Sequence, residues 1–319
     1  MLEKEIGFDI AIDFAEEQNF AENPANLHVV IISDSLKPAS IAVVAAELSK
    51  IQANISAIRR TSSQPLTAIE LDISCPDKSI KEVQKLLAVA AISHKIDLAV
   101  EQGNGMRSAK RLVMLDMDST LIVQEVIDLL AAKAGVAEEV SAITKKAMAG
   151  EMDFAQSLQA RVSLLAGLNE SMLSEVRNEI TLTQGAEKLI QTLHLKGHKV
   201  GVVSGGFIDV IEPILKELKI DFYRANKLQI LNGKLTGKLE GEIIDRAAKL
   251  NALVEFAKNE GVQISQTVAI GDGANDLDMI ESAGLGVAFN AKPKVAAAAA
   301  TTISGSDLSA VLLLMGLSN

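Results

Sequence analysis

The stretch from Arg111 to Leu121, RLVMLDMDSTL, constrains the fold more than any other part of the chain. Residues 112–115 are continuously apolar, which is typical of a strand buried on both faces inside a parallel sheet. Asp116 and Asp118 follow at the carboxyl end of this strand, where open α/β sheets bind their ligands. Turn chemistry alone can put acids and hydroxyls at a strand end. Because buried acids are costly unless something uses them, we interpret the stretch as part of a functional site.

Strands and helices alternate through the rest of the chain beyond residue 110. Apolar strands are predicted at 198–206, at the start of 267–284, at 285–289 and at 301–303, and helices at 124–135, 207–218, 246–260 and from 307. Residues 136–183 are helix-compatible and contain no proline, which predicts a helical subdomain inserted after the first strand. The turn Leu231-Asn232-Gly233-Lys234 predicts a hairpin. The alternation predicts an α/β fold with a doubly wound parallel sheet.

Residues 27–102 carry a different pattern. Strands are predicted at 27–33, 55–62, 67–74 and 96–102, the middle two around the turn 62–65, and helices at 38–51 and 79–93. This βαββαβ order predicts a ferredoxin-like α+β unit and resembles an ACT domain. The resemblance implies small-molecule sensing and regulation. Many ACT domains have a glycine at the start of the first helix, whereas residues 37–40 have none, so a dimerisation or docking module is an equally open interpretation.

The domain boundaries follow from these patterns. We expect an N-terminal extension over 1–26, the ACT-like domain over 27–104 and an α/β domain over 108–319, whose helical cap covers about 124–184. The Gly-rich polar segment 102–109 is the expected joint.

Composition narrows the possible partners and the compartment. The chain has 31 basic and 41 acidic residues, a net charge of −10, and only 3% aromatic residues, which argues against nucleic acids and anionic membranes as partners. Its apolar runs are too short to span a bilayer, and its first residues do not resemble a signal peptide. Cys75 is the only cysteine, so no intrachain disulfide can form. We therefore expect a cytoplasmic protein.

Polar residues also follow the other predicted strands of the parallel sheet. Ser204-Gly205-Gly206 ends one strand, the sequence GDGAND after another supplies Asp272, Asn275 and Asp276, and a helix contributes Lys249. Parallel strands of such a sheet end at one edge, so these residues can meet. Three acids with a lysine suit Mg²⁺ and a phosphate group. The four histidines lack the spacing of zinc ligands.

The motifs DMDST, SGG, Lys249 and GDGAND resemble, in order and spacing, the four motifs of the haloacid dehalogenase superfamily of phosphotransferases. Glu125 and the segment TKKAMAGEMDFAQSLQARVSLLAGL at 144–168 resemble the cap of the phosphoserine phosphatase family. The resemblance implies Mg²⁺-dependent hydrolysis of O-phospho-L-serine, a small-molecule substrate, to L-serine and phosphate. This is the last step of serine biosynthesis, and the family performs it through an aspartyl phosphate.

The resemblance also implies a role for each motif residue. Asp116 is the expected nucleophile and, with Asp272 and the backbone carbonyl of Asp118, a metal ligand. The side chain of Asp118 is the expected general acid and base, and in an extended stretch it would point the same way as Asp116. The residues expected to hold the phosphate are Ser204, Gly205, Gly206 and Lys249. Asn275 is expected to reach the substrate or to support the site, as Asp276 does.

Specificity is expected to come from the cap. Glu125 can hold the ammonium group of phosphoserine, Arg161 can hold its carboxylate, and Met148 and Phe154 would wall the pocket. Three alternatives remain open: transfer of the phosphoryl group to another hydroxyl such as that of homoserine, hydrolysis of another small phosphorylated metabolite, and a non-catalytic amino-acid sensor. ACT-like units often pair, so we expect a homodimer.

Overall fold

The structure is a computed structural model that describes residues 25–33, 36–63, 66–94, 96–103, 111–292, 295–296, 299 and 301–317. The predicted N-terminal extension lies almost entirely outside the described residues. So do residues 64–65 of the turn predicted at 62–65 and most of the joint predicted at 102–109.

A parallel sheet forms the centre of the larger, C-terminal unit, as predicted. Its strands are β5 (Leu112–Leu115), β6 (Lys199–Phe207), β7 (Phe222–Leu231), β9 (Thr267–Gly271), β10 (Leu285–Phe289) and β11 (Thr302–Ile303). They lie in the order β11-β10-β9-β5-β6-β7, and β8 (Lys234–Glu240) adds an antiparallel edge. The β7–β8 turn has positive φ at Asn232 (52°) and Gly233 (72°), the geometry that an Asn-Gly hairpin favours.

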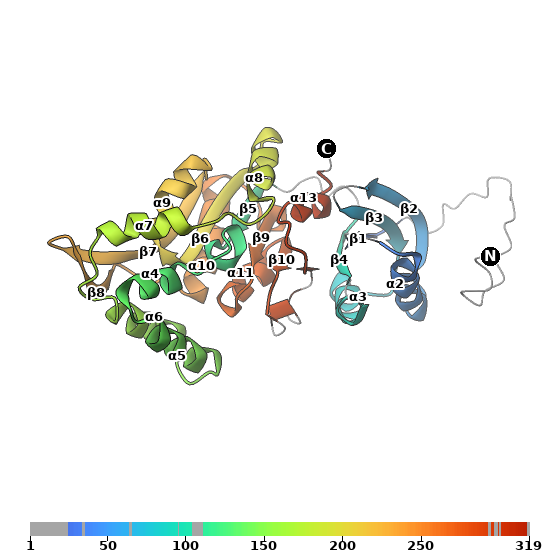
Figure 1. The fold of residues 1–319 in the computed structure, drawn as a ribbon. Helices are drawn as coiled ribbons and strands as arrows, with labels where there is room; N and C mark the ends of the chain where they lie inside the picture. The colour runs from blue at the N-terminus through green and yellow to red at the C-terminus, as the bar shows by residue number, and fades with distance from the viewer. Residues whose placement is uncertain are drawn as a thin grey trace, which may run out of the picture.

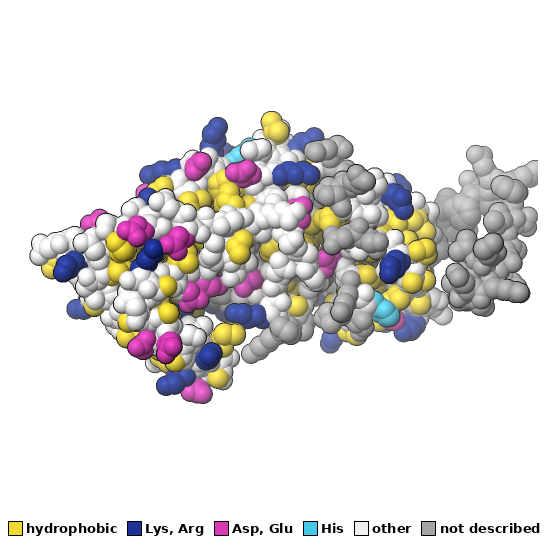
Figure 2. Space-filling view, viewed as in Figure 1, with side chains coloured by type: hydrophobic (Ala, Val, Ile, Leu, Met, Phe, Trp, Pro, Cys, Tyr) yellow, Lys and Arg dark blue, Asp and Glu magenta, His cyan; other side chains and the backbone are white. Residues whose placement is uncertain are grey.

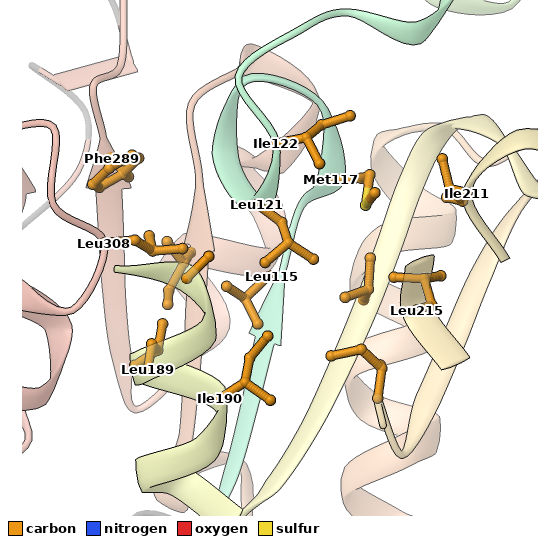
Figure 3. Packing of buried hydrophobic residues seen from close by; sticks show 14 of the residues in the cluster. Leu115, Met117, Leu121, Ile122, Leu189, Ile190, Ile211, Leu215, Phe289 and Leu308 are labelled. Atoms are coloured by element: carbon orange, nitrogen blue, oxygen red, sulfur yellow. The ribbon is translucent and has the colours of Figure 1, made fainter. Parts of the chain in front are cut away.

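Both faces of this sheet are covered, which explains why β5 is apolar at every position. Val113 and Leu115 pack into one hydrophobic cluster, and Leu112 and Met114 into another. Around Leu115, Figure 3 shows side chains from two helices, α8 (Ala186–Leu195) and α9 (Ile208–Glu217). The other cluster packs under α10 (Arg246–Asn259) and α11 (Leu277–Ser282). The sequence reading did not identify α8, although Leu189, Ile190 and Leu193 are buried at helical spacing.

Four helices form the cap between β5 and β6: α4 (Val126–Ala134), α5 (Ala137–Met148), α6 (Phe154–Ser163) and α7 (Ser171–Glu179). Figure 1 shows them at the end of the molecule far from the N-terminal unit. The two segments that connect the cap to the sheet pair with each other through a bridge between Ile122 and Leu182. The N–H of Val123 also donates to the carbonyl of Thr181 at 3.0 Å. The cap is therefore tied to the sheet by a short antiparallel ribbon.

The N-terminal unit has the predicted βαββαβ order. It comprises β1 (Leu27–Ser33), α2 (Pro38–Lys50), β2 (Asn54–Ser62), β3 (Thr67–Ser74), α3 (Ile80–His94) and β4 (Asp97–Gln102). Its strands lie in the order β2-β3-β1-β4, all antiparallel, and one face of the sheet packs on α2 and α3.

The two units join through their sheets, which the sequence did not predict. Strand β4 pairs with β11 at Leu98 and Thr302, so the described strands form one eleven-stranded sheet. The N–H of Ser304 donates to the carboxylate of Asp97 at 2.9 Å. The short helix α13 (Ala310–Leu314) lies between the units in Figure 1. One hydrophobic cluster spans both units. It contains residues of α13 and of the C-terminal core together with four residues of the N-terminal sheet, Val30, Ile32, Ala68 and Ala99.

Charged side chains of both signs lie on the surface of the protein. Figure 2 shows acidic and basic side chains interspersed over the viewed face. Within the described parts of the chain, no helix combines the length and the apolar character needed to cross a membrane.

Candidate active site

The site begins at the end of β5, where the chain turns sharply. Residues Met117–Leu121 form a kinked turn that is not helical at Asp118 and Ser119, and Ser119 has a φ of 55°. Asp116 (φ −72°, ψ 162°) and Asp118 (φ −65°, ψ 135°) both have extended backbone dihedrals, and the backbone turns left-handed at Ser119. The carboxylate of Asp116 accepts the N–H of Met117 at 2.7 Å. That of Asp118 accepts the N–H of Val126, at the start of the cap, at 3.2 Å.

Lys249 reaches the carboxylates from the first turns of α10. Its Nζ lies 2.7 Å from Oδ1 of Asp116 and 2.6 Å from Oδ1 of Asp276. Lys249 and Asp276 are completely buried, and Asp116 is 4% exposed. The helix is held at its start by Asp245, whose side chain accepts the N–H of Ala248 at 2.9 Å. A buried lysine with two carboxylate contacts is a fixed positive charge beside the end of β5.

Three carboxylates meet here in an arrangement that can hold a metal ion. One oxygen from each of Asp116, Asp272 and Asp276 lies within 4.8 Å of the others. All three donors are hard oxygens, and Lys249 leaves two of the three negative charges uncompensated when all are ionised. The cluster therefore fits a hard divalent cation. From the sequence we expected Asp276 only to support the site, whereas in the structure its carboxylate is part of the cluster.

The electrostatics of the cluster show how strongly these groups interact. Burial and then the charge of Asp276 raise the pKa of Asp116 well above its usual value, and Lys249 only partly opposes this. Burial and then Asp276 raise the pKa of Asp272 to about 7. Burial alone would lower the pKa of Lys249, but Asp116 and Asp276 raise it instead, so the lysine stays charged. A bound cation would favour the ionised forms of Asp116 and Asp272.

Asp118 occupies a different environment from Asp116. Burial and then the charge of Glu125 raise the pKa of Asp118 to about 8. Its side chain lies against Gly206, where an added Cβ would come 2.7 Å from Oδ2. Asp118 therefore lies between the end of β5 and the loop at the end of β6.

The Ser204-Gly205-Gly206 segment forms an irregular end to β6. Ser204 is fully buried, and its Oγ accepts the N–H of Gly206 at 2.8 Å. The ring of Phe154, the first residue of α6, would lie 3.0 Å from a Cβ at Gly205. A side chain at Gly205 would press on Phe154 of the cap, and one at Gly206 would displace the carboxylate of Asp118.

The cap residues predicted from the sequence differ in their burial and in their contacts with the site. Glu125 is exposed, and it accepts a hydrogen bond from Ser119 Oγ at 2.7 Å. Arg161 is partly buried on α6, where burial lowers its pKa and the charges of Glu125, Asp128 and Asp118 oppose that shift. Met148, at the end of α5, is 62% exposed, unlike the predicted wall of a pocket.

The remaining positions lie in the loop after β9. Asn275 is part of the short turn η4 (Ala274–Asp276), and its Oδ1 lies close to Gly273. The carboxylate of Asp276 accepts the N–H of Gly273 at 3.0 Å, which ties the loop to the buried cluster.

Sequence reasoning missed two polar residues near the cap. Ser119 orients Glu125, and its position inside DMDST could have suggested a role. The pKa of Asp128 on α4 is raised by burial and then by Glu125, and Arg161 opposes the rise, so this acid shares their environment. Glu125 directly precedes α4 and Asp128 lies in its first turn, and this spacing of three residues was the available signal.

Comparisons with known proteins agree with this geometry. Residues 113–281 match the haloacid dehalogenase-like hydrolase family, and residues 26–101 match the ACT domain. The chain belongs to the haloacid dehalogenase-like hydrolases and carries an N-terminal ACT domain.

Several of the proteins that the chain is similar to are named phosphoserine phosphatases. A phosphoserine phosphatase of Streptomyces coelicolor is 48% identical over 91% of this chain and 70% of its own length. A solved phospho-aspartyl intermediate analogue of a phosphoserine phosphatase is 46% identical, with a TM-score of 0.61 over 64% of this chain and 98% of its own. The unliganded crystal structure of a probable phosphoserine phosphatase from Vibrio cholerae is 34% identical, with a TM-score of 0.70 over 91% of this chain and 86% of its own.

Proposed function

We propose that this enzyme hydrolyses O-phospho-L-serine to L-serine and phosphate with Mg²⁺ as its cofactor. One observation carries the proposal: the carboxylate of Asp116 is held 2.7 Å from a fully buried lysine, inside a cluster of acids, at the end of a parallel strand. The cap that follows carries an acid, Glu125, and a base, Arg161, which match the two charges of a serine. Phosphoserine phosphatases among the relatives support the same substrate.

The first chemical step forms an aspartyl phosphate. An oxygen of Asp116 attacks phosphorus, and the bond from phosphorus to the serine oxygen breaks. Lys249 lowers the repulsion between the attacking carboxylate and the phosphate dianion. Ser204 and the N–H groups of Gly205 and Gly206 hold the phosphoryl oxygens. When bound, the metal ion supplies further positive charge between carboxylates and phosphate, and Asp116, Asp272 and Asp276 would hold it with the carbonyl of Asp118.

Asp118 moves the protons in both steps. It gives its proton to the departing serine oxygen, so serine leaves as a neutral alcohol. The resulting carboxylate then takes a proton from the water that attacks the aspartyl phosphate, which restores Asp118 and Asp116 and releases phosphate. Its position beside Gly206, between the nucleophile and the cap, supports this role.

The cap is proposed to select the amino-acid part of the substrate. Glu125, oriented by Ser119 Oγ, binds the ammonium group, and Arg161 binds the carboxylate with two parallel hydrogen bonds. Phe154 closes the site over Gly205, Met148 joins the pocket wall only when the substrate is bound, and Asn275 supports the phosphate loop.

We also propose the organisation of the whole chain. Residues 27–104 form a regulatory or dimerisation domain and 108–319 the catalytic domain, with its cap at about 124–184. A homodimer is supported by β2, which ends the sheet and exposes 59% of Ile58. A cytoplasmic location is supported by the single, buried Cys75, which suits a reducing compartment.

Phosphate release from phosphoserine by the purified protein tests the function. We expect activity with Mg²⁺, loss of activity with EDTA, and loss in Asp116→Asn, which removes the nucleophile but keeps the side-chain shape. Full activity in Asp116→Asn would refute the nucleophile assignment. Added homoserine distinguishes hydrolysis from transfer, because phosphohomoserine in place of free phosphate would contradict a hydrolase.

The Arg161→Ala variant tests substrate specificity. We expect KM for phosphoserine to rise about 100-fold, while KM for p-nitrophenyl phosphate, which has no carboxylate, changes little. Arg224→Ala is a matched control, since Arg224 is a surface arginine paired with Glu255. An equal rise in KM for both substrates would contradict the role of Arg161.

A further inference from the structure

The irregular end of β6 depends on a residue of the neighbouring strand. Ser204 pairs with Ala225 of β7, but the next pair is Phe207 with Asn226, so Gly205 and Gly206 are two extra residues in β6. Such an insertion interrupts the ladder and leaves backbone groups in need of other partners. The carbonyl of Gly205 accepts a hydrogen bond from Nδ2 of Asn226 at 2.8 Å. A side chain of β7 therefore holds the inserted peptide.

Asn226 uses both ends of its carboxamide. Its side-chain oxygen accepts the N–H of Ile244 at 2.8 Å, and the residue is only 1% exposed. The orientation of the amide follows from its partners, because a backbone carbonyl only accepts and a backbone N–H only donates. An aspartate could satisfy Ile244 but not Gly205, and a leucine could satisfy neither.

The first contact determines where the N–H of Gly206 points. The carbonyl of Gly205 and the N–H of Gly206 belong to one planar trans peptide, so they point in opposite directions. Holding that carbonyl at Asn226 directs the N–H of Gly206 away from β7, where it meets Ser204 Oγ at 2.8 Å. Glycine backbones rotate more freely than others, so this peptide needs an external partner to keep its orientation.

The second contact reaches the helix that carries the lysine. Ile244 is followed by Asp245, which caps α10, and the N–H of Lys249 makes a helical hydrogen bond to the carbonyl of Asp245 at 3.0 Å. The side chain of Lys249 then extends to Asp116 at 2.7 Å. Asn226 thus links the phosphate-binding peptide and the origin of α10 through one rigid amide.

We propose that Asn226 is a positioning residue for phosphoryl transfer, which holds the Gly206 N–H and the Lys249 helix in register with Asp116. The inference rests on the proposed function, because it assigns these two groups to the phosphoryl oxygens and the nucleophile. Donors directed at developing charge act on the transition state more than on substrate binding. Loss of the two hydrogen bonds of the Asn226 carboxamide therefore lowers the rate of the chemical step and leaves KM nearly unchanged.

Single-turnover kinetics of Asn226→Asp, with enzyme in excess and Mg²⁺ present, test the proposal. The substitution keeps the size of the side chain and the acceptor for Ile244, and its ionised form has no donor for Gly205. Because burial favours the protonated acid, which could still donate, the rate constant is measured over a range of pH and compared at the highest pH at which the wild type is stable. We expect the first-order rate constant to fall about 10- to 100-fold at full amplitude, because a donor has lost its alignment. The same factor is expected for phosphoserine and p-nitrophenyl phosphate, since the phosphoryl group is common to both.

A matched control exists in the N-terminal unit. The side chain of Asn26 also makes two hydrogen bonds to backbone groups, donating to the carbonyl of Cys75 at 3.3 Å and accepting the N–H of Cys75 at 2.8 Å. Asn26→Asp is expected to leave the rate constant unchanged. A rate constant for Asn226→Asp within about threefold of the wild type would overturn the proposal. A lower amplitude with an unchanged rate constant would also overturn it, because that result reports only a smaller folded fraction.

Two further arms keep the result interpretable. If Asn226→Asp does not fold, as judged by its thermal transition, Asn226→Ala replaces it, since it removes both the donor to Gly205 and the acceptor for Ile244; the same two outcomes then decide. If the wild type turns over p-nitrophenyl phosphate but not phosphoserine, the proposed substrate is wrong, while the p-nitrophenyl phosphate arm still tests Asn226.

Discussion

Replacing Lys249 with methionine tests whether this one buried cation holds the active site together. The side chains are similar in length, so Lys249→Met removes the charge with little change in volume. Lys249 has no exposed surface, and its Nζ contacts Asp116 at 2.7 Å and Asp276 at 2.6 Å. The variant leaves three neighbouring carboxylates, those of Asp116, Asp272 and Asp276, without their internal cation.

The expected magnitudes follow from this burial. Removing one partner from a buried ion pair costs about 3–5 kcal/mol of stability. Protonation of the orphaned acids limits that cost, since the pKa of Asp116 is already raised by burial and by Asp276. The rate should suffer more, because the nucleophile is then partly protonated and the phosphate has lost a neighbouring positive charge. We expect kcat to fall by about 10²–10³ or more.

Urea denaturation and steady-state kinetics, each with and without Mg²⁺, measure both effects. Mg²⁺ should stabilise Lys249→Met more than the wild type, because the ion then faces three uncompensated acids rather than a partly neutralised set. Lys133→Met is the control, since Lys133 pairs with Glu175 and Glu179 on the surface of the cap. A kcat of Lys249→Met within about threefold of the wild type would refute the reasoning, as would equal stabilisation of both proteins by Mg²⁺.

Two further changes test other parts of the structure. Gly206→Ala would place a Cβ 2.7 Å from Asp118 Oδ2 and 3.0 Å from Ser204 Oγ. We expect kcat to fall about 10- to 100-fold with a smaller effect on thermal stability, and an unchanged kcat would contradict the close approach of Asp118. Asp221 tests electrostatics far from the site: burial would raise its pKa, but hydrogen bonds from Lys199, the Val200 N–H and His194 lower it overall. A lowered pKa stabilises the fold above the unfolded value of about 3.9, and this stabilisation is lost as pH falls through the folded value. Asp221→Asn should therefore be less stable than the wild type in urea at pH 7, and the difference should shrink below pH of about 4; a difference independent of pH would contradict the assignment.

Local patterns in the sequence were sufficient to predict most elements. β1 was predicted at its observed bounds, Leu27–Ser33, because its apolar run ends abruptly at polar residues. The acids after β5 and β9 were predicted to meet because parallel strands end at one edge. In the structure one oxygen from each of Asp116, Asp272 and Asp276 lies within 4.8 Å of the others. Such inferences work where a short window determines the structure, as it does for a buried strand or an Asn-Gly turn.

Contacts between distant segments could not be predicted in this way. Leu98 and Thr302 join the two sheets although about 200 residues separate them, and neither sequence carries a pattern that specifies the other. The left-handed backbone of Ser119 is set by the turn that must fit between β5 and the cap. The hydrogen bonds of the Asn226 side chain could not be predicted either, because its partners Gly205 and Ile244 come from two other segments.

The order of the strands explains why one edge of the sheet brings together four of the residues proposed to act in the reaction. β9, β5, β6 and β7 are consecutive neighbours. They contribute in turn Asp272, Asp116, Ser204 and Asn226. The central strand carries the proposed nucleophile, and the strands on either side carry an acid proposed to hold the metal and a hydroxyl proposed to hold the phosphate. β7 is one strand further away and acts through backbone contacts instead. Substitutions near β5 should therefore remove groups that take part in the reaction, whereas a substitution at Asn226 of β7 should disturb only the alignment of those groups. The two kinds of substitution are expected to lower the rate by different amounts.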